Sequence, residues 1–284
     1  MAQSAESVRV AVRVRPEEGP SDGRVDSSGT CIRPVDSRKL TVLGPSTTRQ
    51  SERQAYDFSF DRVFPPESAQ NEVFELVSPL VDATVEGYTT TVFAYGSTGS
   101  GKTHTISGDQ SSPGVLPRAV ELLFDRLAAD TASGSDKAFM VFLTYVEIYN
   151  NTFHNLLQGA AEKQAGGEGS GGGGAGVGGG ARRRGSLGPG EAENAPKIEV
   201  REHPQRGVFL AGGSGLRVPV TSAAGVMSLI RRGMRSRATA ATNLNDRSSR
   251  SHAILILEIE ANEGHPAAAR LPPPPPVAAA PAPT

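Results

Sequence analysis

The sequence predicts an α/β fold. Segments rich in β-branched and aromatic residues alternate along the chain with segments that carry apolar residues at three- and four-residue spacings, and this alternation is typical of α/β domains. One apolar segment, Thr89–Tyr95, also leads directly into the glycine-rich sequence GSTGSGKT. These two observations favour the α/β class, with strands and helices that follow one another along the chain.

The N-terminal part predicts three extended segments. Valines at positions 8, 10, 12 and 14 alternate with arginines and alanine, the pattern of a strand with one buried face, and Pro16 ends it. A second strand is expected at Leu40–Leu43. Tyr56–Phe64 places aromatic residues two and four positions apart before two prolines, which also favours extended structure.

A helix and a buried strand are expected next. Ser68 is a suitable N-cap for a helix that runs to about Glu86 and is stopped by Gly87. Its apolar residues recur at helical spacings. Thr89–Tyr95 (TTTVFAY) is rich enough in β-branched and aromatic residues to form a buried strand.

The rest of the chain continues the alternation. The expected elements are a helix at Ala119–Ala129, a strand at Ala138–Tyr149, short strands at Lys197–Arg201 and Val208–Leu210, a helix from Thr221 or Ser222 to about Arg237, and a strand at Ala253–Ile259.

Two segments have compositions that cannot form a packed core. The region at about 160–195 is dominated by glycine, and residues 263–284 form a proline- and alanine-rich tail. Both are predicted to be disordered. One folding domain is therefore expected over residues 1–262, interrupted by the glycine-rich insertion.

Composition excludes several classes of function. The formal net charge of -1 gives no overall field that would attract a nucleic acid. A single cysteine, Cys31, excludes an internal disulfide, and the five histidines show no zinc-ligand spacing. The strongest late apolar run, Phe139–Leu143, is too short to cross a bilayer. We expect an intracellular protein that binds neither nucleic acid nor membrane.

The glycine-rich sequence fits G-x-x-x-x-G-K-[ST] at every fixed position. Its residues are Gly96, Ser97, Thr98, Gly99, Ser100, Gly101, Lys102 and Thr103. Glycines allow backbone N–H groups to converge on phosphate oxygens at a helix N-terminus. Lys102 would reach the β- and γ-phosphates, and the Thr103 hydroxyl would bind Mg²⁺. The alternative is a Gly/Ser loop that ends in Lys-Thr by chance.

A second cluster of polar residues lies at Asn245–His252 (NDRSSRSH), immediately before an apolar strand. By composition alone, such a segment is usually a solvated turn. Beside a phosphate loop, its hydroxyls and arginines would also suit a segment that responds to a γ-phosphate.

The residues of both motifs resemble the kinesin superfamily. The resemblance rests on VRVAVRVRP, TVFAYGSTGSGKTHTISG and NLNDRSSRSH, and extends to YDFSFDRVF and TYVEIYNN. It also includes the residues that lead into NLNDRSSRSH, such as Gly233 and Arg237. The resemblance implies a kinesin motor fold with a central mixed β-sheet flanked by helices, an ATPase with Mg²⁺, and microtubules as the partner in the cytoplasm.

The resemblance also assigns roles to residues. Arg13, Pro16 and His104 would flank the adenine, and Arg15 belongs to the same motif. In the second cluster, termed switch I in kinesins, Asn245, Ser248 and Ser249 would surround the γ-phosphate and Mg²⁺. Arg250 would pair with a glutamate of the segment that kinesins call switch II. These four residues and Lys102 are the expected catalytic residues, and Thr103 and Ser249 the expected metal ligands.

The main departure of the chain from the family lies after the second cluster. Kinesins continue with a D-x-x-G-x-E segment, whereas the only D-x-x-G here is Asp26–Gly29, near the N-terminus. We therefore expect an incomplete motor fold whose 284 residues alone are inactive and at best marginally folded.

Two alternatives and one surface cluster complete the expectations. The chain could instead be a non-motor module that binds nucleotide or tubulin without turnover, or another phosphate-loop enzyme such as a small-molecule kinase. Arginines 231, 232, 235 and 237 could meet the acidic surface of tubulin, but a solvated helix end is the simpler interpretation.

Overall fold

The computed structural model describes residues 8–16, 31–44, 54–132, 137–158, 197–204, 207–213, 215–242 and 251–263. The chain divides into two compact units, Met1–Leu122 and Leu123–Thr284. The expected glycine-rich insertion and all but the first residue of the expected C-terminal tail lie outside the described residues.

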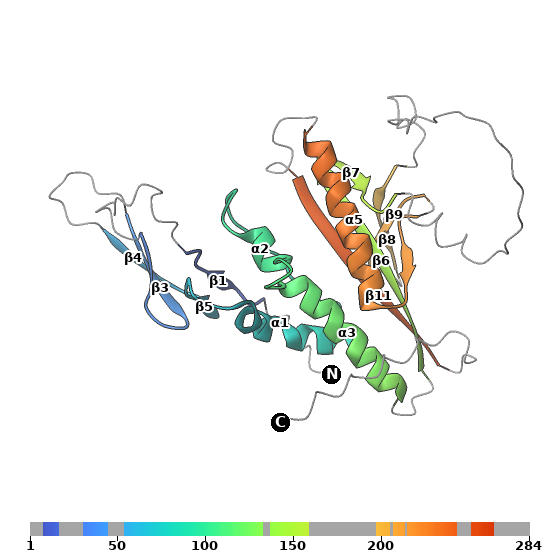
Figure 1. Ribbon diagram of the computed structural model, residues 1–284, viewed down its shortest axis with the longest axis horizontal. Coiled ribbons are helices and arrows are strands. Elements are labelled where there is room, and N and C mark those ends of the chain that lie inside the picture. Colours follow the sequence, from blue (N-terminus) through green and yellow to red (C-terminus); the bar gives the residue numbers. More distant parts are fainter. Residues whose placement is uncertain are drawn as a thin grey trace, which may run out of the picture. The chain divides into compact units, whose positions relative to one another are not determined.

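The first unit contains five short strands. They are β1 (Ala11–Arg13), β2 (Ile32–Pro34), β3 (Lys39–Leu43), β4 (Ala55–Ser59) and β5 (Arg62–Phe64). β1 pairs in parallel with β5, and β2, β3 and β4 form an antiparallel sheet in that order. The N–H of Val63 donates to the carbonyl of Ser37 at 2.7 Å, which joins the strand pair to the sheet (Figure 1). The strands predicted at Leu40–Leu43 and Tyr56–Phe64 are thereby confirmed.

The expected opening strand is shorter than its sequence pattern. Val14 is buried, whereas Val8 is 80% exposed and Val10 49% exposed. The N–H of Val14 donates to the carbonyl of Phe64 at 2.9 Å, so only this end of the segment reaches the core. The alternation places the four valines on one face of the segment. They are buried only where other side chains cover that face, which is the case at Val14.

Helices complete the first unit. α1 (Gln70–Val85) and α2 (Lys102–Ile106) belong to it, and α3 (Val115–Ala132) begins in it. The core joins Phe64 of β5, Val73 and Val77 of α1, and Val115 of α3. These contacts explain the helical spacing of the apolar residues in α1, since residues four apart lie on one face of a helix.

Ser68 does not cap α1. The N-cap is Ala69, whose N–H donates to a carboxylate oxygen of Glu72 at 3.3 Å. The N–H of Ser68 donates to the carbonyl of Pro65 instead, which keeps Ser68 in the preceding turn. Its hydroxyl is buried without a hydrogen-bond partner among the described residues. The helix ends as expected before Gly87, whose φ is 102°.

The prediction of a buried strand at Thr89–Tyr95 is wrong. The segment forms no strand, and Phe93 and Tyr95 are 79% and 95% exposed. A strand needs a neighbour that accepts and donates its backbone hydrogen bonds. No strand among the described residues pairs with this segment. The high β-propensity of Thr89–Tyr95 is therefore insufficient to form a strand without a pairing strand.

The second unit is built around a long strand. Its elements are β6 (Lys137–Tyr149), β7 (Thr152–Asn155), β8 (Glu199–His203), β9 (Gly207–Ala211), β10 (Val218–Val220), α5 (Ala223–Thr242) and β11 (Ser251–Glu263). β6 lies between β10 and β11, β7 also pairs with β6, and β8 pairs with β9. All of these pairs are antiparallel, with Val146 opposite Ile254 in the central register. The strands and the helix predicted in this part of the chain are confirmed.

α5 packs along the sheet formed by β6 and β11 (Figure 1). Its N-terminus is capped as expected by Ser222, whose Oγ accepts the N–H of Gly225 at 3.1 Å. Val226 and Ile230 of the helix are buried, as are Val141 and Leu143 of β6. Because α5 and its neighbours cover β6, the strand reads as a nearly continuous apolar segment. Within the described ranges, no helix is long and apolar enough to cross a membrane.

Candidate functional site

Left-handed glycines shape the loop between the exposed segment and α2. The φ angles of Gly99 and Gly101 are 80° and 98°, values that residues with a side chain rarely adopt. A Cβ atom on Gly96 would lie 2.4 Å from the Ser100 hydroxyl, so a side chain there would displace the Ser100 side chain. Backbone geometry therefore favours glycine at positions 99 and 101.

Lys102 is the first residue of α2 and its side chain turns back over the loop. Its Nζ donates to the carbonyl oxygens of Gly96 at 2.8 Å and Ser97 at 2.7 Å. Thr103 follows and is exposed. The ammonium group therefore lies beside the loop backbone, as the motif predicts for a lysine that contacts phosphate.

Arg15 contacts the same loop from the end of β1. Its guanidinium donates a hydrogen bond to the carbonyl of Gly99, while Pro16 is exposed beside it. Two of the basic side chains singled out in the sequence, Arg15 and Lys102, therefore both bond to backbone carbonyls of the loop. The loop thus has positive charge on two sides.

Arg13 binds protein groups. Its NH1 donates to Gln70 Oε1 at 2.9 Å and to the Thr105 hydroxyl at 3.2 Å, and its NH2 donates to the Ser68 carbonyl at 3.0 Å. Partial burial lowers the pKa of Arg13, and the nearby Glu72 carboxylate partly offsets that shift. Arg13 therefore links β1 to the start of α1 and to Thr105 of α2.

Gln70 is a member of this site that the sequence did not indicate. It is the first residue of α1 and only 3% exposed. Its Nε2 donates to the backbone carbonyl of His104 at 2.7 Å and lies 3.3 Å from His104 Nε2. A glutamine at the start of a helix carries no sequence signal of burial, because glutamines are usually exposed.

A tight turn closes α2. Gly108 has a φ of 63°, and a Cβ atom there would lie 2.2 Å from the carbonyl oxygen of Ser112. Asp109 Oδ1 accepts hydrogen bonds from the Ser111 hydroxyl at 2.6 Å and from the N–H groups of Ser111 and Ser112, both at 2.8 Å. The Ser111 hydroxyl, followed by these N–H groups, lowers the pKa of Asp109.

The second unit carries an ion pair next to the predicted switch I segment. Arg237 of α5 donates to Glu147 Oε1 of β6 at 2.8 Å and to the Ser251 hydroxyl of β11 at 2.8 Å. The side chain of Glu147 is 2% exposed. Arg237 is thus not part of a solvated helix end, because α5 continues to Thr242. The predicted residues Asn245, Ser248, Ser249 and Arg250 lie outside the described residues.

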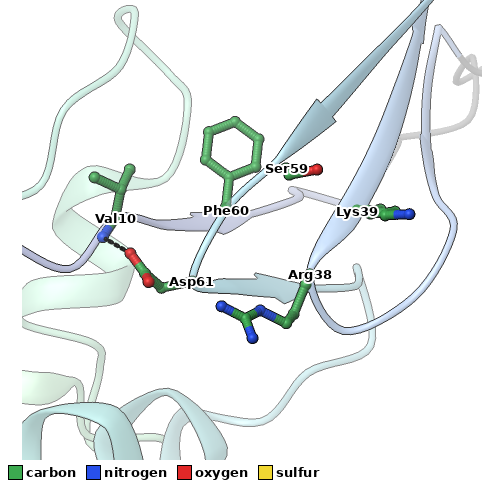
Figure 2. A pocket seen from close by; sticks show the side chains of 6 residues that line it. All are labelled: Val10, Arg38, Lys39, Ser59, Phe60 and Asp61. Carbon is green, nitrogen blue, oxygen red and sulfur yellow. Dashed lines mark hydrogen bonds between the residues drawn. The ribbon is translucent and has the colours of Figure 1, made fainter.

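One surface hollow lies away from the loop. It is lined by Val10, Arg38, Lys39, Ser59, Phe60 and Asp61 (Figure 2). The N–H of Val10 donates to Asp61 Oδ2 at 2.8 Å across it. None of the residues predicted to bind nucleotide lines this hollow.

The family model of the kinesin motor domain matches residues 13–270. The chain belongs to the kinesin motor domain family. This match includes the glycine-rich loop, the Gln70 network, the Arg237–Glu147 pair and the predicted switch I segment. The family therefore accounts for the elements of both compact units.

Individual kinesins are similar over most of the chain. Kinesin-like protein KIFC1 of Rattus norvegicus is 35% identical over 272 residues, which cover 89% of this chain and 34% of that protein. Kinesin-like protein KIN-8B of Arabidopsis thaliana is 30% identical over 268 residues, with coverages of 92% and 28%. This chain thus spans about a third of the length of these kinesin relatives.

Solved kinesin structures share the fold. A fast kinesin, described for its ATPase mechanism and its interactions with microtubules, matches with a TM-score of 0.66 and 29% identity over 92% of this chain and 62% of that chain. A KIF14 dimer with AMP-PNP on a microtubule matches with a TM-score of 0.63 and 30% identity, covering 90% and 61%. The expected α/β kinesin fold is thereby confirmed. Membership of the kinesin family does not favour the non-motor module or the small-molecule kinase.

Proposed function

We propose that this chain binds Mg-ATP at the loop Gly96–Thr103, and that the whole protein couples ATP hydrolysis to movement along microtubules. The observation that carries the proposal is the loop itself. Left-handed glycines at positions 99 and 101 shape its backbone, and the Lys102 ammonium lies within 2.8 Å of two of its carbonyl oxygens.

The residues present suit a triphosphate with magnesium. Lys102 and Arg15 offer positive charge on the loop. The exposed Thr103 hydroxyl is an oxygen donor of the kind that Mg²⁺ prefers. When bound, magnesium would neutralise phosphate charge. Ser249 as second ligand, and Asn245, Ser248 and Arg250 around the γ-phosphate, remain predictions from the resemblance.

The proposal includes the expected adenine contacts, but the role of Arg13 changes from direct to indirect contact. The Arg13 guanidinium donates to Gln70 at the start of α1 and to Thr105 of α2, so we expect it to support a bound base mainly through these helices. His104 and Pro16 are both exposed beside this network and stay available for direct contact.

Microtubules are the proposed partner and the cytoplasmic cytoskeleton the proposed location. The KIF14 structure described above is a complex with a microtubule, which supports the same partner for this chain. Co-sedimentation of the protein with microtubules, in the presence and absence of a non-hydrolysable ATP analogue, tests this part of the proposal.

Nucleotide binding is tested with a fluorescent ATP analogue and magnesium. Lys102→Ala is compared with Lys39→Ala, which removes an exposed lysine of β3 in the same unit. We expect Lys102→Ala to weaken binding by about tenfold to hundredfold, as for loss of a charged hydrogen-bond donor, and Lys39→Ala to leave it unchanged.

Equal binding by the wild type and Lys102→Ala would contradict the proposed site. Lys102-dependent binding without microtubule-stimulated turnover by the whole protein would favour a non-motor module.

A further inference from the structure

Gln70 places a buried amide between β1 and α2. It is only 3% exposed, and both ends of its amide are used: Oε1 accepts from Arg13, and Nε2 donates to the backbone carbonyl of His104. A guanidinium can only donate and a carbonyl can only accept. The amide therefore has one possible orientation, with its oxygen toward Arg13.

This orientation also assigns the proton of His104. The second hydrogen of the Gln70 amino group points to the neighbour 3.3 Å away, His104 Nε2, which must then be an acceptor. In a neutral imidazole the proton lies on the other nitrogen, Nδ1, when Nε2 accepts. Gln70 thus selects the Nδ1–H form of His104.

α2 depends on such contacts for its position. It has five residues, and its backbone bonds include Thr105 N–H to Gly101 at 2.9 Å and Ser107 N–H to Thr103 at 2.8 Å. An isolated helix of this length is unstable in water. Gln70 holds the His104 carbonyl directly, and Arg13 holds the Thr105 hydroxyl at 3.2 Å. These anchors lie two and three residues after Lys102.

We propose that Gln70 is a positioning residue for the phosphate loop, which acts through His104 and Arg13 to hold α2, and with it Lys102 and Thr103, in place for nucleotide. The inference rests on the proposed function, because the group being positioned is the proposed nucleotide site. The described hydrogen bonds of the Gln70 side chain go to Arg13 and His104, so it acts through these two neighbours.

Two substitutions separate the contact of Gln70 with Arg13 from its contact with His104. Gln70→Leu removes all three side-chain hydrogen bonds at similar volume. Gln70→Glu keeps an acceptor for Arg13 but replaces the donor to the His104 carbonyl with an oxygen. Val77→Ala is the matched control, because Val77 is buried in the core on the same helix and its truncation destabilises the unit without touching α2.

The first readout is the affinity for the fluorescent ATP analogue, at a temperature where all variants are folded. We expect Gln70→Leu and Gln70→Glu to bind about tenfold more weakly than the wild type, the size of effect typical for an unsatisfied buried group. Val77→Ala should bind within about twofold, since it loses stability alone. Unchanged affinity in Gln70→Leu, or an equal loss in Val77→Ala, would overturn the proposal.

Two further readouts need no nucleotide. Nitrogen NMR of His104 should show the Nδ1–H form in the wild type and a shift away from it in Gln70→Glu. Amide exchange at Thr105 and Ser107 should be about tenfold faster in both Gln70 variants than in Val77→Ala. Exchange rates equal to those of the control would refute the anchoring of α2.

The outcomes also distinguish the two proposals. If the wild type does not bind the analogue, the proposed function fails and the nucleotide part of this inference fails with it, while exchange still decides whether Gln70 anchors α2. If the wild type binds in a Lys102-dependent manner and the Gln70 variants match it, the inference alone fails.

Discussion

The guanidinium of Arg237 donates to the carboxylate of Glu147 at 2.8 Å, across the interface between α5 and β6. Glu147 is buried, with 2% of its side chain exposed, whereas 27% of the Arg237 side chain is exposed. The same arginine also donates to the hydroxyl of Ser251 at 2.8 Å. Arg237 therefore ties the helix before residues 243–250 to the strand that follows them.

Loss of this arginine should destabilise the protein strongly. Arg237→Ala removes the guanidinium that pairs with the buried carboxylate of Glu147, and breaking a buried ion pair costs about 3–5 kcal/mol. Urea unfolding measures the change in the free energy of unfolding. Arg231→Ala, which removes an exposed arginine of the same helix, should change it by less than about 0.5 kcal/mol. Similar effects of the two substitutions would mean that the ion pair contributes no stability.

The contact between Gly233 and Tyr145 predicts an overpacking effect. A Cβ atom on Gly233 would lie 2.6 Å from two carbon atoms of the Tyr145 ring, so α5 must move away from β6 to accept Gly233→Ala. We expect a loss of about 1–3 kcal/mol by thermal unfolding. Gly225→Ala on the same helix meets only the Ser222 hydroxyl, at 3.3 Å, and should be neutral or slightly stabilising. A neutral result at Gly233 would contradict the close packing of α5.

The glycines that follow α1 and α2, Gly87 and Gly108, predict losses of stability of different size when each is replaced by alanine. Both Gly87 and Gly108 have positive φ angles, of 102° and 63°, so alanine costs about 1–2 kcal/mol at either position. Only Gly108 also has backbone atoms in the way, within 2.3 Å of a Cβ. Gly108→Ala should therefore lower the midpoint of urea unfolding further than Gly87→Ala. The reverse order would show that the turn at Gly108 opens readily.

The Asp109 turn predicts a pH dependence. The Ser111 hydroxyl is the main cause that lowers the pKa of Asp109 below 3.8, so Ser111→Ala should raise that pKa. Because the folded-state pKa is the lower one, the turn stabilises the fold above the unfolded-state pKa and loses this contribution as pH falls through the folded-state value.

Carbon NMR titration of the Asp109 carboxyl measures this effect. Ser112→Ala is the control, because Ser112 contributes through its backbone N–H and should leave the pKa of Asp109 near the wild-type value. No rise in Ser111→Ala would assign the effect to the backbone N–H groups, and an equal rise in both variants would show that the Ser111 hydroxyl is not its specific cause.

The local sequence pattern was sufficient to predict the long helices and strands of this kinesin motor domain. β6, α3 and α5 each follow from the apolar spacing of their own residues, and the Ser222 cap is visible in the sequence. The glycine-rich motif likewise located the loop and Lys102, because its function depends on residues that are neighbours in the chain. Thr89–Tyr95 was the exception, since its strand propensity could not supply a pairing partner.

The sequence by itself thus determined the family, the order of most elements and the position of the glycine-rich loop, all of which depend on short-range patterns. Only the tertiary structure decided the burial of Gln70 and the pairing of Arg237 with Glu147. Arg13 and Gln70 are 57 residues apart, and Arg237 and Glu147 are 90 residues apart. A polar side chain looks alike in sequence whether solvated or buried, and only the partner that folding brings to it determines its role.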